Sequence, residues 1–503
     1  MTVADVFSTL RDITTAGGTV GRLAHDAEVS AVTYDSRRAI PGSIFVALRG
    51  LKADGAEFVA QAVGRGAAMV VAETPRREGV DVDWLVVSDA RLALALLADA
   101  VYDHPSRRMT VIGVTGTNGK TTTAYLLASM LDAAGTKAGL LGTVTYRLGA
   151  EEREASRTTP EAPDVQQLLD EMIRQGCKAA VMEVSSHALA LKRVDGMRFA
   201  AAIFTNLTRD HLDFHADMES YFGAKRRLFE LLPDDAPGII NLDDPRGADL
   251  IGICRKPVTF AISRAADVTP GPLEFTLNGL SFDVRTPAGA VRVVSRLVGR
   301  PNVYNILAAS ASAVAIDVPL EAIARGVESL PGVPGRFEVV SSPTDEVTVV
   351  VDYAHTDDAL RNLLETARPL APRRLVTVFG CGGDRDTTKR PLMGMVAARL
   401  SDIVVITSDN PRSEDPQRII DEIKRGIPAG GHGGRTQDVL SIVDRREAIE
   451  RAVEQAEAGD VVLIAGKGHE KYQQIGDRVL PFDDGEIARE ALERRRQGGG
   501  GSQ

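Results

Sequence analysis

The feature that most constrains the fold is a strand, a glycine-rich loop and a helix that follow one another between residues 109 and 135. The run "MTVIGVTG" is typical of a buried strand, "KTTTAYLLASMLDAAG" of a helix, and "KAGLLGTV" of the next strand. The same alternation of short apolar runs with helix-length amphipathic segments continues almost throughout the chain. Because strands joined by helices pair in parallel, the sequence predicts an α/β fold built on parallel sheets.

Length and two breaks in this pattern predict three α/β domains. A chain of 503 residues corresponds to about three domains of ordinary size. The pattern is interrupted at "DHPSRR" and again at the Pro- and Gly-rich "LPGVPGR", and a new strand follows each break. We predict a smaller N-terminal domain over residues 1–107, a central phosphate-loop domain with a parallel sheet over 108–334, and a C-terminal Rossmann-like domain over 335–495. Residues 496–503 are predicted to be a flexible tail.

Charge and cysteine content exclude several classes of protein. The formal net charge is −10, whereas general nucleic-acid or anionic-membrane binders carry a basic face or arm. The three cysteines are scattered, without disulfide or zinc spacing, which fits a reducing cytoplasm. The first residues lack the pattern of a signal peptide, and no apolar stretch is long enough to span a bilayer. We therefore expect a cytoplasmic protein with no nucleic-acid partner and no membrane span.

The loop between the strand and the helix has the chemistry of a nucleotide site. Its glycines let backbone N–H groups turn toward phosphate oxygens, and the helix N-terminus adds its positive dipole end. Lys120 would reach the β- and γ-phosphates, and Thr121 would offer its hydroxyl to Mg²⁺. Val114 stands where the strict pattern has a glycine, so Gly116 would supply the early turn. A chance Gly-rich turn is the alternative, which the flanking strand and helix disfavour. The predicted ATP-binding residues of the loop are Gly116, Thr117, Asn118, Gly119, Lys120, Thr121 and Thr122.

Two later strands end at candidate metal ligands. One strand is predicted over residues 179–182 and leads into Glu183; another ends near Asn206, with Asp210 and His211 just beyond. The carboxyl ends of parallel strands meet at one edge of a sheet, so these side chains are expected beside the phosphates. A carboxylate suits Mg²⁺, whereas an imidazole is a less usual ligand. For His211 a helix-capping or packing role is the alternative.

An arginine follows another predicted strand. In "VVITSDNPRSEDP" the apolar run over residues 404–406 predicts a buried strand, and the residues up to Arg412 predict a loop at its end. Asp, Asn and Pro form turns for local reasons, so a plain turn is one interpretation. The other is a binding loop, because α/β proteins bind ligands at the carboxyl ends of their strands.

Several stretches together resemble one family. The segments "VTGTNGKTTT", "MEVSSHALALKRV", "FTNLTRDHLDFH", "YFGAKRRLF", "GRPNVYNILAA", "PGRFE" and "VDYAHTDDAL" occur in the order seen in the Mur ligases of peptidoglycan synthesis. "DSRRAIPGSIFVALRGLKADGAEFVAQAV", "CGGDRDTTKRPLMG", "SDNPRSEDP" and "GKGHEKYQ" narrow the resemblance to the members that add meso-diaminopimelate. The resemblance covers roughly residues 30–485. It disfavours other branches of the superfamily, the MurF and MurC ligases and folylpolyglutamate synthase.

The resemblance implies an ATP-dependent amide ligase that uses ATP and Mg²⁺. Its substrates would be UDP-MurNAc-L-Ala-D-Glu and meso-diaminopimelate, and the protein would act as a monomer. ATP would phosphorylate the γ-carboxylate of D-glutamate, and the amine of diaminopimelate would attack the acyl phosphate. Lys120 and Mg²⁺ would neutralise the charge that develops when the two anions meet.

The resemblance also assigns residues by position. Lys120, Glu183, His211 and Lys225 would be catalytic; Thr121, Glu183, His211 and Lys225 would hold metal, with Lys225 carbamylated to N6-carboxylysine. From the residues alone, Lys225 would be a helix-surface lysine. Further ATP contacts would come from Asn302, Arg336 and Asp352. The UDP-sugar peptide would be bound by Ser36, Thr158, Thr159, Ser185 and Arg193. Diaminopimelate would be bound by Arg390, Asp409, Asn410, Pro411, Arg412, Gly466 and Glu470.

Two other classes of function compete with a ligase. A phosphate-loop NTPase that works as a switch or motor would turn over ATP without an amine substrate. A non-catalytic nucleotide-binding module would not need Lys120, Glu183 and Lys225 together. A requirement for both predicted substrates in phosphate release distinguishes the ligase from both alternatives.

Overall fold

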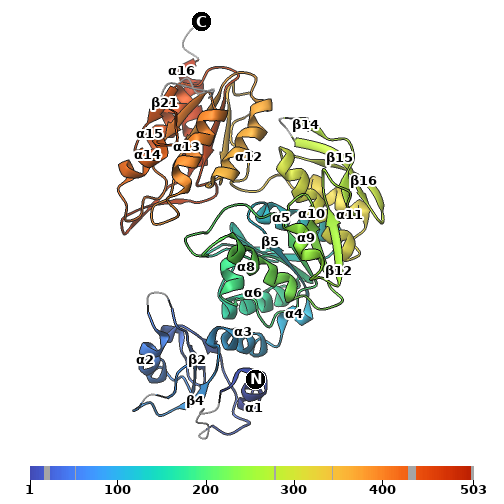
Figure 1. The fold of residues 1–503 in the computed structure, drawn as a ribbon, viewed down its shortest axis with the longest axis vertical. Coiled ribbons are helices and arrows are strands. Elements are labelled where there is room, and N and C mark those ends of the chain that lie inside the picture. Colours follow the sequence, from blue (N-terminus) through green and yellow to red (C-terminus); the bar gives the residue numbers. More distant parts are fainter. Residues whose placement is uncertain are drawn as a thin grey trace.

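The computed structural model describes residues 1–15, 23–50, 53–76, 78–276, 279–342, 344–428 and 438–499. These residues form three α/β domains, arranged as separate bodies along the chain (Figure 1). The predicted α/β class with three domains is therefore confirmed. Its residue boundaries stay predictions. Among the described helices, none combines the length and the apolar character needed to cross a membrane.

The N-terminal domain is a four-stranded parallel sheet in the order β1-β2-β3-β4. Neighbouring residues of its strands alternate between two cores: Ile44 and Val46 pack with α1 and α3, whereas Phe45 and Ala47 pack with α2. Burial on both faces is the usual condition of a parallel sheet. The strands are β1 (Val32–Thr33), β2 (Ile44–Ala47), β3 (Met69–Ala72) and β4 (Asp83–Val86). The helices are α1 (Val3–Thr9), α2 (Val59–Gly64), α3 (Ala90–Val101) and α4 (Pro105–Arg108), with 3₁₀ turns at Arg11–Ile13, Ser36–Arg38 and Gly55–Phe58.

The central domain contains an eight-stranded sheet in the order β12-β11-β10-β5-β9-β6-β7-β8. Its strands are parallel from β12 to β6, and β7 and β8 are antiparallel. The strands are β5 (Thr110–Thr115), β6 (Ala138–Leu141), β7 (Thr145–Leu148), β8 (Glu151–Glu154), β9 (Ala179–Glu183), β10 (Ala201–Phe204), β11 (Pro237–Asn241) and β12 (Lys256–Phe260). A small antiparallel sheet adds β13 (Thr269–Pro270), β14 (Glu274–Thr276), β15 (Gly279–Thr286) and β16 (Gly289–Ser295).

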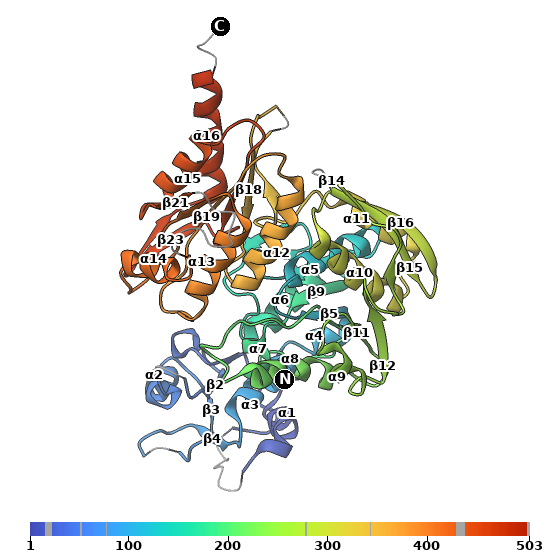
Figure 2. The ribbon, with the colours of Figure 1, turned by 45° about the horizontal axis from the view of Figure 1, so that its top comes forward.

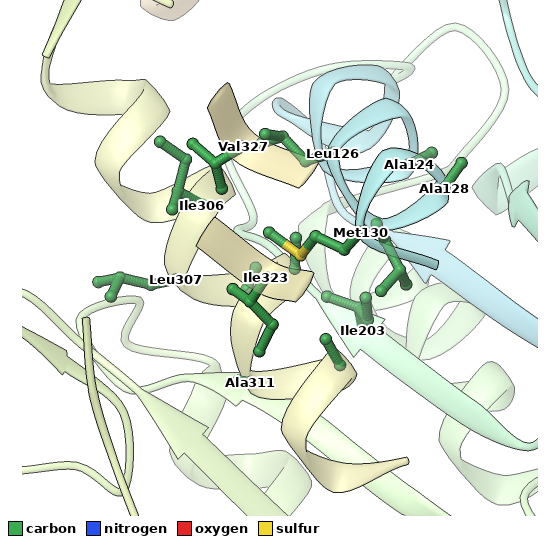
Figure 3. Close-up of a cluster of buried hydrophobic side chains, with 14 of the residues drawn as sticks. Ala124, Leu126, Ala128, Met130, Ile203, Ile306, Leu307, Ala311, Ile323 and Val327 are labelled. Atoms are coloured by element: carbon green, nitrogen blue, oxygen red, sulfur yellow. The ribbon is translucent and has the colours of Figure 1, made fainter. Parts of the chain in front are cut away.

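Helices cover both faces of the central sheet. They are α5 (Lys120–Ala133), α6 (Ala162–Arg174), α7 (Ser186–Ala190), α8 (Met218–Glu230), α9 (Gly247–Ile251), α10 (Arg300–Ala315) and α11 (Leu320–Ser329). Figure 3 shows one face, where Leu126 and Met130 of α5 meet Ile306 of α10 and Ile323 and Val327 of α11. This packing holds α5, and with it the loop that precedes α5, rigidly against the end of β5.

The C-terminal domain is a six-stranded sheet in the order β17-β18-β22-β19-β20-β21, in which only the edge strand β17 is antiparallel. The strands are β17 (Glu338–Val339), β18 (Thr348–Asp352), β19 (Leu375–Phe379), β20 (Ile403–Ile406), β21 (Asp438–Ser441) and β22 (Val461–Ala465), with a separate hairpin of β23 (Tyr472–Ile475) and β24 (Arg478–Pro481). The helices are α12 (Asp357–Ala367), α13 (Lys389–Leu400), α14 (Pro416–Lys424), α15 (Arg445–Glu454) and α16 (Asp484–Gly499), with a 3₁₀ turn at Arg368–Leu370.

The end of the chain differs in part from the prediction. Helix α16 continues to Gly499, so residues 496–499 are helical rather than the start of a flexible tail. The arginine-rich last turns contact the body of the domain, because Arg496 pairs with Asp345 and Arg495 donates to the Glu454 carbonyl. Residues 500–503 of the predicted tail lie outside the described residues.

Candidate active site

The predicted phosphate loop lies between β5 and α5 and depends on its glycines. Gly116 and Gly119 have φ angles of 142° and 84°, in the region that side-chain-bearing residues avoid. A Cβ on Gly116 would lie 1.9 Å from Thr205 Oγ1, and a Cβ on Gly119 would lie 2.3 Å from Asn305 Oδ1. Among the described residues, no side chain caps the N-terminus of α5. Its first N–H groups are therefore available to an anion such as phosphate.

Lys120 and Lys225 meet at one backbone carbonyl of this loop. Lys120 Nζ donates to Gly116 O at 3.0 Å and to Thr117 O at 2.7 Å, and Lys225 Nζ, from α8, donates to Gly116 O at 2.7 Å. Burial lowers the pKa of Lys120, and burial together with the Lys120 charge lowers the pKa of Lys225 well below its ordinary value. Two buried amines at one acceptor make this place receptive to negative charge.

Glu183, at the end of β9, is buried in a set of hydroxyl groups. Its Oε2 accepts hydrogen bonds from Thr121 Oγ1 and Thr143 Oγ1, both at 3.0 Å, and its Oε1 accepts from Thr143 N at 2.7 Å. Thr143 also contacts Thr158, with 3.0 Å between their hydroxyl oxygens. Thr143 was not among the predicted site residues, although it follows β6 at the same sheet edge, and the strand-end rule that identified Glu183 would have found it.

His211 lies at the mouth of this site with a neutral ring. Its φ of 55° is in the left-handed region, and its ring centroid lies 4.8 Å from that of His187. Burial lowers the pKa of His211 to about 3. A neutral imidazole keeps a lone pair for a metal ion. Among the described residues, no three His, Cys, Asp or Glu side chains are grouped so that they could hold a metal. A metal site here therefore needs the Thr121 hydroxyl and a further anionic ligand.

A cavity of about 930 Å³ joins these groups to the C-terminal domain. Its volume is in the range of small-molecule sites. The predicted residues that line it are Thr117, Asn118, Gly119, Lys120, Thr121, Thr122, Thr158, Glu183, Ser185, His211, Lys225, Asn302, Arg336 and Asp352. Those that do not line it are Gly116, Thr159, Arg193, Ser36 and all seven residues assigned to diaminopimelate.

Contacts across the cavity hold the central and C-terminal domains together. Arg336 Nη2 donates to Thr121 Oγ1 at 3.3 Å, and Asn118 Nδ2 donates to Asp358 Oδ2, at the start of α12, at 3.2 Å. Figure 2 shows α12 facing α5 across this interface. The Asp352 carboxylate accepts hydrogen bonds from the N–H groups of Phe337 and Ala354, each at 2.7 Å. The phosphate loop and the start of α5 are therefore in direct contact with the third domain.

A second cavity, of about 460 Å³, lies between the N-terminal and central domains and is lined by Tyr34, Arg38, Tyr146, Arg157, Glu161 and Asp164 among others. Ser36 lies two residues from Tyr34, and its Oγ is 2.6 Å from Gln61 Oε1. Arg193 pairs with Glu161 at 2.6 Å and donates to Thr159 O at 3.0 Å. Arg193 therefore contacts the wall of the second cavity through Glu161, and Ser36 lies in the chain between two lining residues, Tyr34 and Arg38.

Arg412, on the predicted binding loop after β20, has a fixed backbone and a guanidinium group that is only partly hydrogen-bonded. Its φ is 52°, which costs a non-glycine residue about 1 kcal/mol or more. Two hydrogen bonds to the β23–β24 hairpin hold it there, from Arg412 N to Gln474 O at 3.1 Å and from Gly476 N to Arg412 O at 2.7 Å. The guanidinium Nη1 donates to Gly383 O at 2.7 Å. Within the described residues Nε and Nη2 have no hydrogen bond, so they can meet a carboxylate.

Arg390 is placed differently from Arg412. It is fully buried, and its two terminal nitrogens donate to Glu414 at 2.8 and 2.9 Å, to Glu422 at 2.7 Å and to Gly382 O at 3.2 Å. In this structure Arg390 joins the Gly382 turn to the loop of Arg412. Its direct role in binding stays a prediction.

Gly466 and Glu470, the predicted substrate residues on the loop after β22, lie against the loop of Arg412. Asn410 Nδ2 donates to Glu470 Oε2 at 2.9 Å, and a Cβ on Gly466 would lie 2.7 Å from Asp409 Oδ2. Burial raises the pKa of Glu470. This loop also adjoins the first cavity, because the ring centroids of His469 and the cavity residue Tyr353 are 5.0 Å apart.

All three domains of the chain resemble known proteins. Residues 28–102 match the family described as "Mur ligase family, catalytic domain", residues 114–313 "Mur ligase middle domain", and residues 335–468 "Mur ligase, glutamate ligase domain". Proteins named UDP-N-acetylmuramoyl-L-alanyl-D-glutamate--2,6-diaminopimelate ligase are similar. That of Gloeobacter violaceus is 49% identical over 475 residues, covering 94% of this chain and 96% of the relative. That of Solibacter usitatus is 48% identical, covering 92% and 94%. A solved structure of a ligase with the same name is 34% identical, with a TM-score of 0.68 and 99% of both chains covered.

Proposed function

Since the chain belongs to the Mur ligase family, we propose that it is an ATP-dependent ligase that joins 2,6-diaminopimelate to UDP-N-acetylmuramoyl-L-alanyl-D-glutamate. The product is a precursor of peptidoglycan. The observation that carries this proposal is 49% identity over nearly the whole of a relative that bears this ligase's name. The convergence of the phosphate loop, Glu183 and Lys225 on one interdomain cavity supports it.

The first half of the reaction converts a carboxylate into an electrophile. The D-glutamate γ-carboxylate attacks the γ-phosphorus of ATP, ADP leaves, and an acyl phosphate forms. Two anions approach each other in this step. Lys120, released from its own loop carbonyls, would turn toward the phosphates, and the N–H groups at the start of α5 would face the same oxygens. Arg336 brings a further positive charge from the third domain to the hydroxyl of Thr121.

The donor set fits Mg²⁺. The hydroxyl of Thr121 and the carboxylate of Glu183 are 3.0 Å apart, and hard oxygen ligands of this kind are the ones Mg²⁺ prefers. Lys225 as a carbamate would supply anionic oxygens in addition to those of Glu183, and neutral His211 would complete the set. When bound, the ion would neutralise charge on the phosphate oxygens.

The second half of the reaction uses the third domain. The amine of meso-diaminopimelate attacks the acyl carbon, a tetrahedral intermediate forms, and phosphate leaves as the amide bond closes. Arg412 would bind the distal carboxylate and Glu470 the distal ammonium, which orients the reacting amine toward the cavity. The 5.0 Å ring contact between His469 and Tyr353 links this loop to the cavity wall.

The direct test is phosphate release from purified protein. We expect release only when ATP, the UDP-linked dipeptide and meso-diaminopimelate are all present, with the tripeptide product detected by mass. A switch or motor NTPase would release phosphate without the amine, and a binding module would release none.

Replacing Arg412 with alanine should lower kcat/KM for meso-diaminopimelate by at least about a hundredfold, the ~3 kcal/mol expected of a charged, hydrogen-bonded pair. The weak use of L-lysine should change little, because lysine has no distal carboxylate. Both constants are measured in the same ligase assay. Arg385→Ala, on an exposed neighbouring arginine, is the matched control and should leave both unchanged.

A glycine variant separates the guanidinium of Arg412 from its backbone. Glycine adopts a φ of 52° without strain, so Arg412→Gly should lose as much diaminopimelate activity as Arg412→Ala if the guanidinium binds substrate. Recovery of activity in the glycine variant, or equal loss of both amino acids in the alanine variant, would contradict the assignment.

Ser36→Ala should raise the KM for the UDP-linked dipeptide roughly fivefold, as expected for one lost hydrogen bond. Its hydroxyl lies 2.6 Å from Gln61 Oε1, and Ser36 does not line the cavity that contains the phosphate loop. The KM for ATP should therefore stay near the wild-type value. Ser8→Ala, an exposed serine of the same domain, serves as control; a raised KM for ATP alone would move the UDP site elsewhere.

A further inference from the structure

Lys467 is a fully buried cation that the reaction outlined above does not use. It lies between Gly466 and Glu470 on the loop after β22, and its side chain has no exposed surface. Its Nζ donates to Asn410 Oδ1 at 3.1 Å and to Glu470 Oε2 at 3.2 Å, and lies 5.3 Å from the centroid of the Tyr472 ring. A buried ammonium is costly unless oxygen partners are held around it. Here both partners are residues assigned to substrate.

These contacts fix the direction of two side chains. Asn410 Oδ1 accepts from Lys467 Nζ and from Gln474 N at 2.9 Å, while its Nδ2 donates to Glu470 Oε2 at 2.9 Å. The orientation of the amide is therefore fully determined. Glu470 Oε2 receives two of these hydrogen bonds, whereas Oε1 receives none within the described residues. Lys467 thus occupies one oxygen of Glu470 and leaves the other for a ligand.

Lys467 also balances charge on the two loops. Asp409 and Glu470 are acidic, and Lys467 and Arg412 are basic, so the set is neutral; beneath it Arg445 is paired with Asp484 at 2.6 Å. The distal end of meso-diaminopimelate carries one ammonium and one carboxylate and is also neutral. The distal end of lysine is a lone cation. A neutral set of charges suits the distal end of meso-diaminopimelate. It offers the lone ammonium of lysine only one carboxylate that is not already balanced.

We propose that Lys467 is a positioning residue that aims Glu470 and Asn410 at the substrate and, by cancelling one acidic charge, disfavours lysine relative to diaminopimelate. This inference rests on the proposed function. It assigns specificity to a residue that is out of contact with solvent and acts through its two neighbours.

The test is the variant Lys467→Met, which removes the charge and keeps an unbranched side chain. We expect kcat/KM for meso-diaminopimelate to fall about thirtyfold, within the range for hydrogen bonds to charged groups. That for L-lysine should change less than about threefold, because removal of the Lys467 charge favours its lone ammonium and offsets the lost aim of Glu470. The discrimination ratio should therefore fall about tenfold or more, while the KM values for ATP and the UDP-linked dipeptide stay unchanged. Lys471→Met is the matched control, because Lys471 is an exposed lysine four residues further along the chain. Lys467→Gln, which keeps a donor, carries the test if the methionine variant does not fold.

A pH profile gives a readout that a merely structural role would not move. Burial and the charge of Asp409 raise the pKa of Glu470, and Lys467 and Asn410 oppose that rise; Tyr353, Tyr472 and Arg445 are the other titratable groups that sense its charge. Binding of an ammonium needs Glu470 ionised, so it is lost as pH falls through this pKa. Without Lys467 the acid limb of kcat/KM for diaminopimelate should move to higher pH.

The outcomes separate the inference from the proposed function. A wild-type protein that does not use diaminopimelate would defeat the proposed function. A wild-type protein that uses it, with equal loss of both amino acids or an unmoved acid limb in the folded Lys467 variants, would defeat only the inference about Lys467.

Discussion

Lys120→Ala protein is expected to release phosphate at least about a thousandfold more slowly than wild type, near the upper range for losing a preorganised charge at a phosphoryl-transfer site. The reason is geometric. Lys120 is the first residue of the helix that follows the phosphate loop. Its ammonium donates to two carbonyl oxygens of the loop, at 2.7 and 3.0 Å. A small rotation of its side chain would bring it to a bound phosphate. No other lysine projects from this loop.

The variant should nevertheless fold. Lys120 is not a member of the hydrophobic cluster formed by α5, α10 and α11, and burial lowers the pKa of the ammonium, so its loss relieves a desolvation cost. Thermal unfolding should occur near the wild-type midpoint. Lys137→Ala, which removes a hydrogen bond to the exposed Gln175 carbonyl, is the control and should keep wild-type turnover. Unchanged turnover in Lys120→Ala would refute the phosphate-loop assignment.

The second large effect is expected at Lys225. Lys225→Ala should lower kcat on the order of a thousandfold, about 4 kcal/mol, and short carboxylic acids such as acetate should restore part of it. The amine is buried at 2% exposure beside Lys120, and both conditions favour its uncharged form. An uncharged amine adds CO₂ and releases a proton to give a carbamate. That reaction converts a buried neutral amine into an anion, which the neighbouring Lys120 ammonium would stabilise and whose oxygens could bind a metal ion.

Carbon-13 NMR of wild-type protein equilibrated with labelled bicarbonate should show a carbamate resonance that is missing from Lys225→Ala. Arg226→Ala, in which the lost side chain faces solvent and pairs with Glu230, should retain both the resonance and the activity. An active, metal-loaded enzyme with an unmodified Lys225 would contradict the prediction.

Local sequence patterns determined the elements that carry the site. The strand that becomes β5, the glycine loop and α5 follow from the residue propensities of one stretch of chain. The positive φ of Gly119 is a conformation that glycine allows. The apolar runs that become β9 and β20 likewise predicted where Glu183 and the loop of Arg412 would lie. Backbone conformation depends mainly on near neighbours, so such features can be predicted without knowing the fold.

Only the tertiary structure decided what those side chains contact. Gly116 O accepts from Lys225, 109 positions away, and Glu183 meets Thr143 of a different strand end. Arg390 lies in the first turn of a helix and Arg412 follows a strand, yet the first is enclosed by Glu414 and Glu422 and the second keeps free donors. A single sequence does not encode such pairings as a local pattern, because they are set by how helices and sheets pack. The sequence by itself determined the α/β fold, the phosphate loop and the strand-end loops. The packing of three domains decided which charges are buried together, and therefore which of them can reach a substrate.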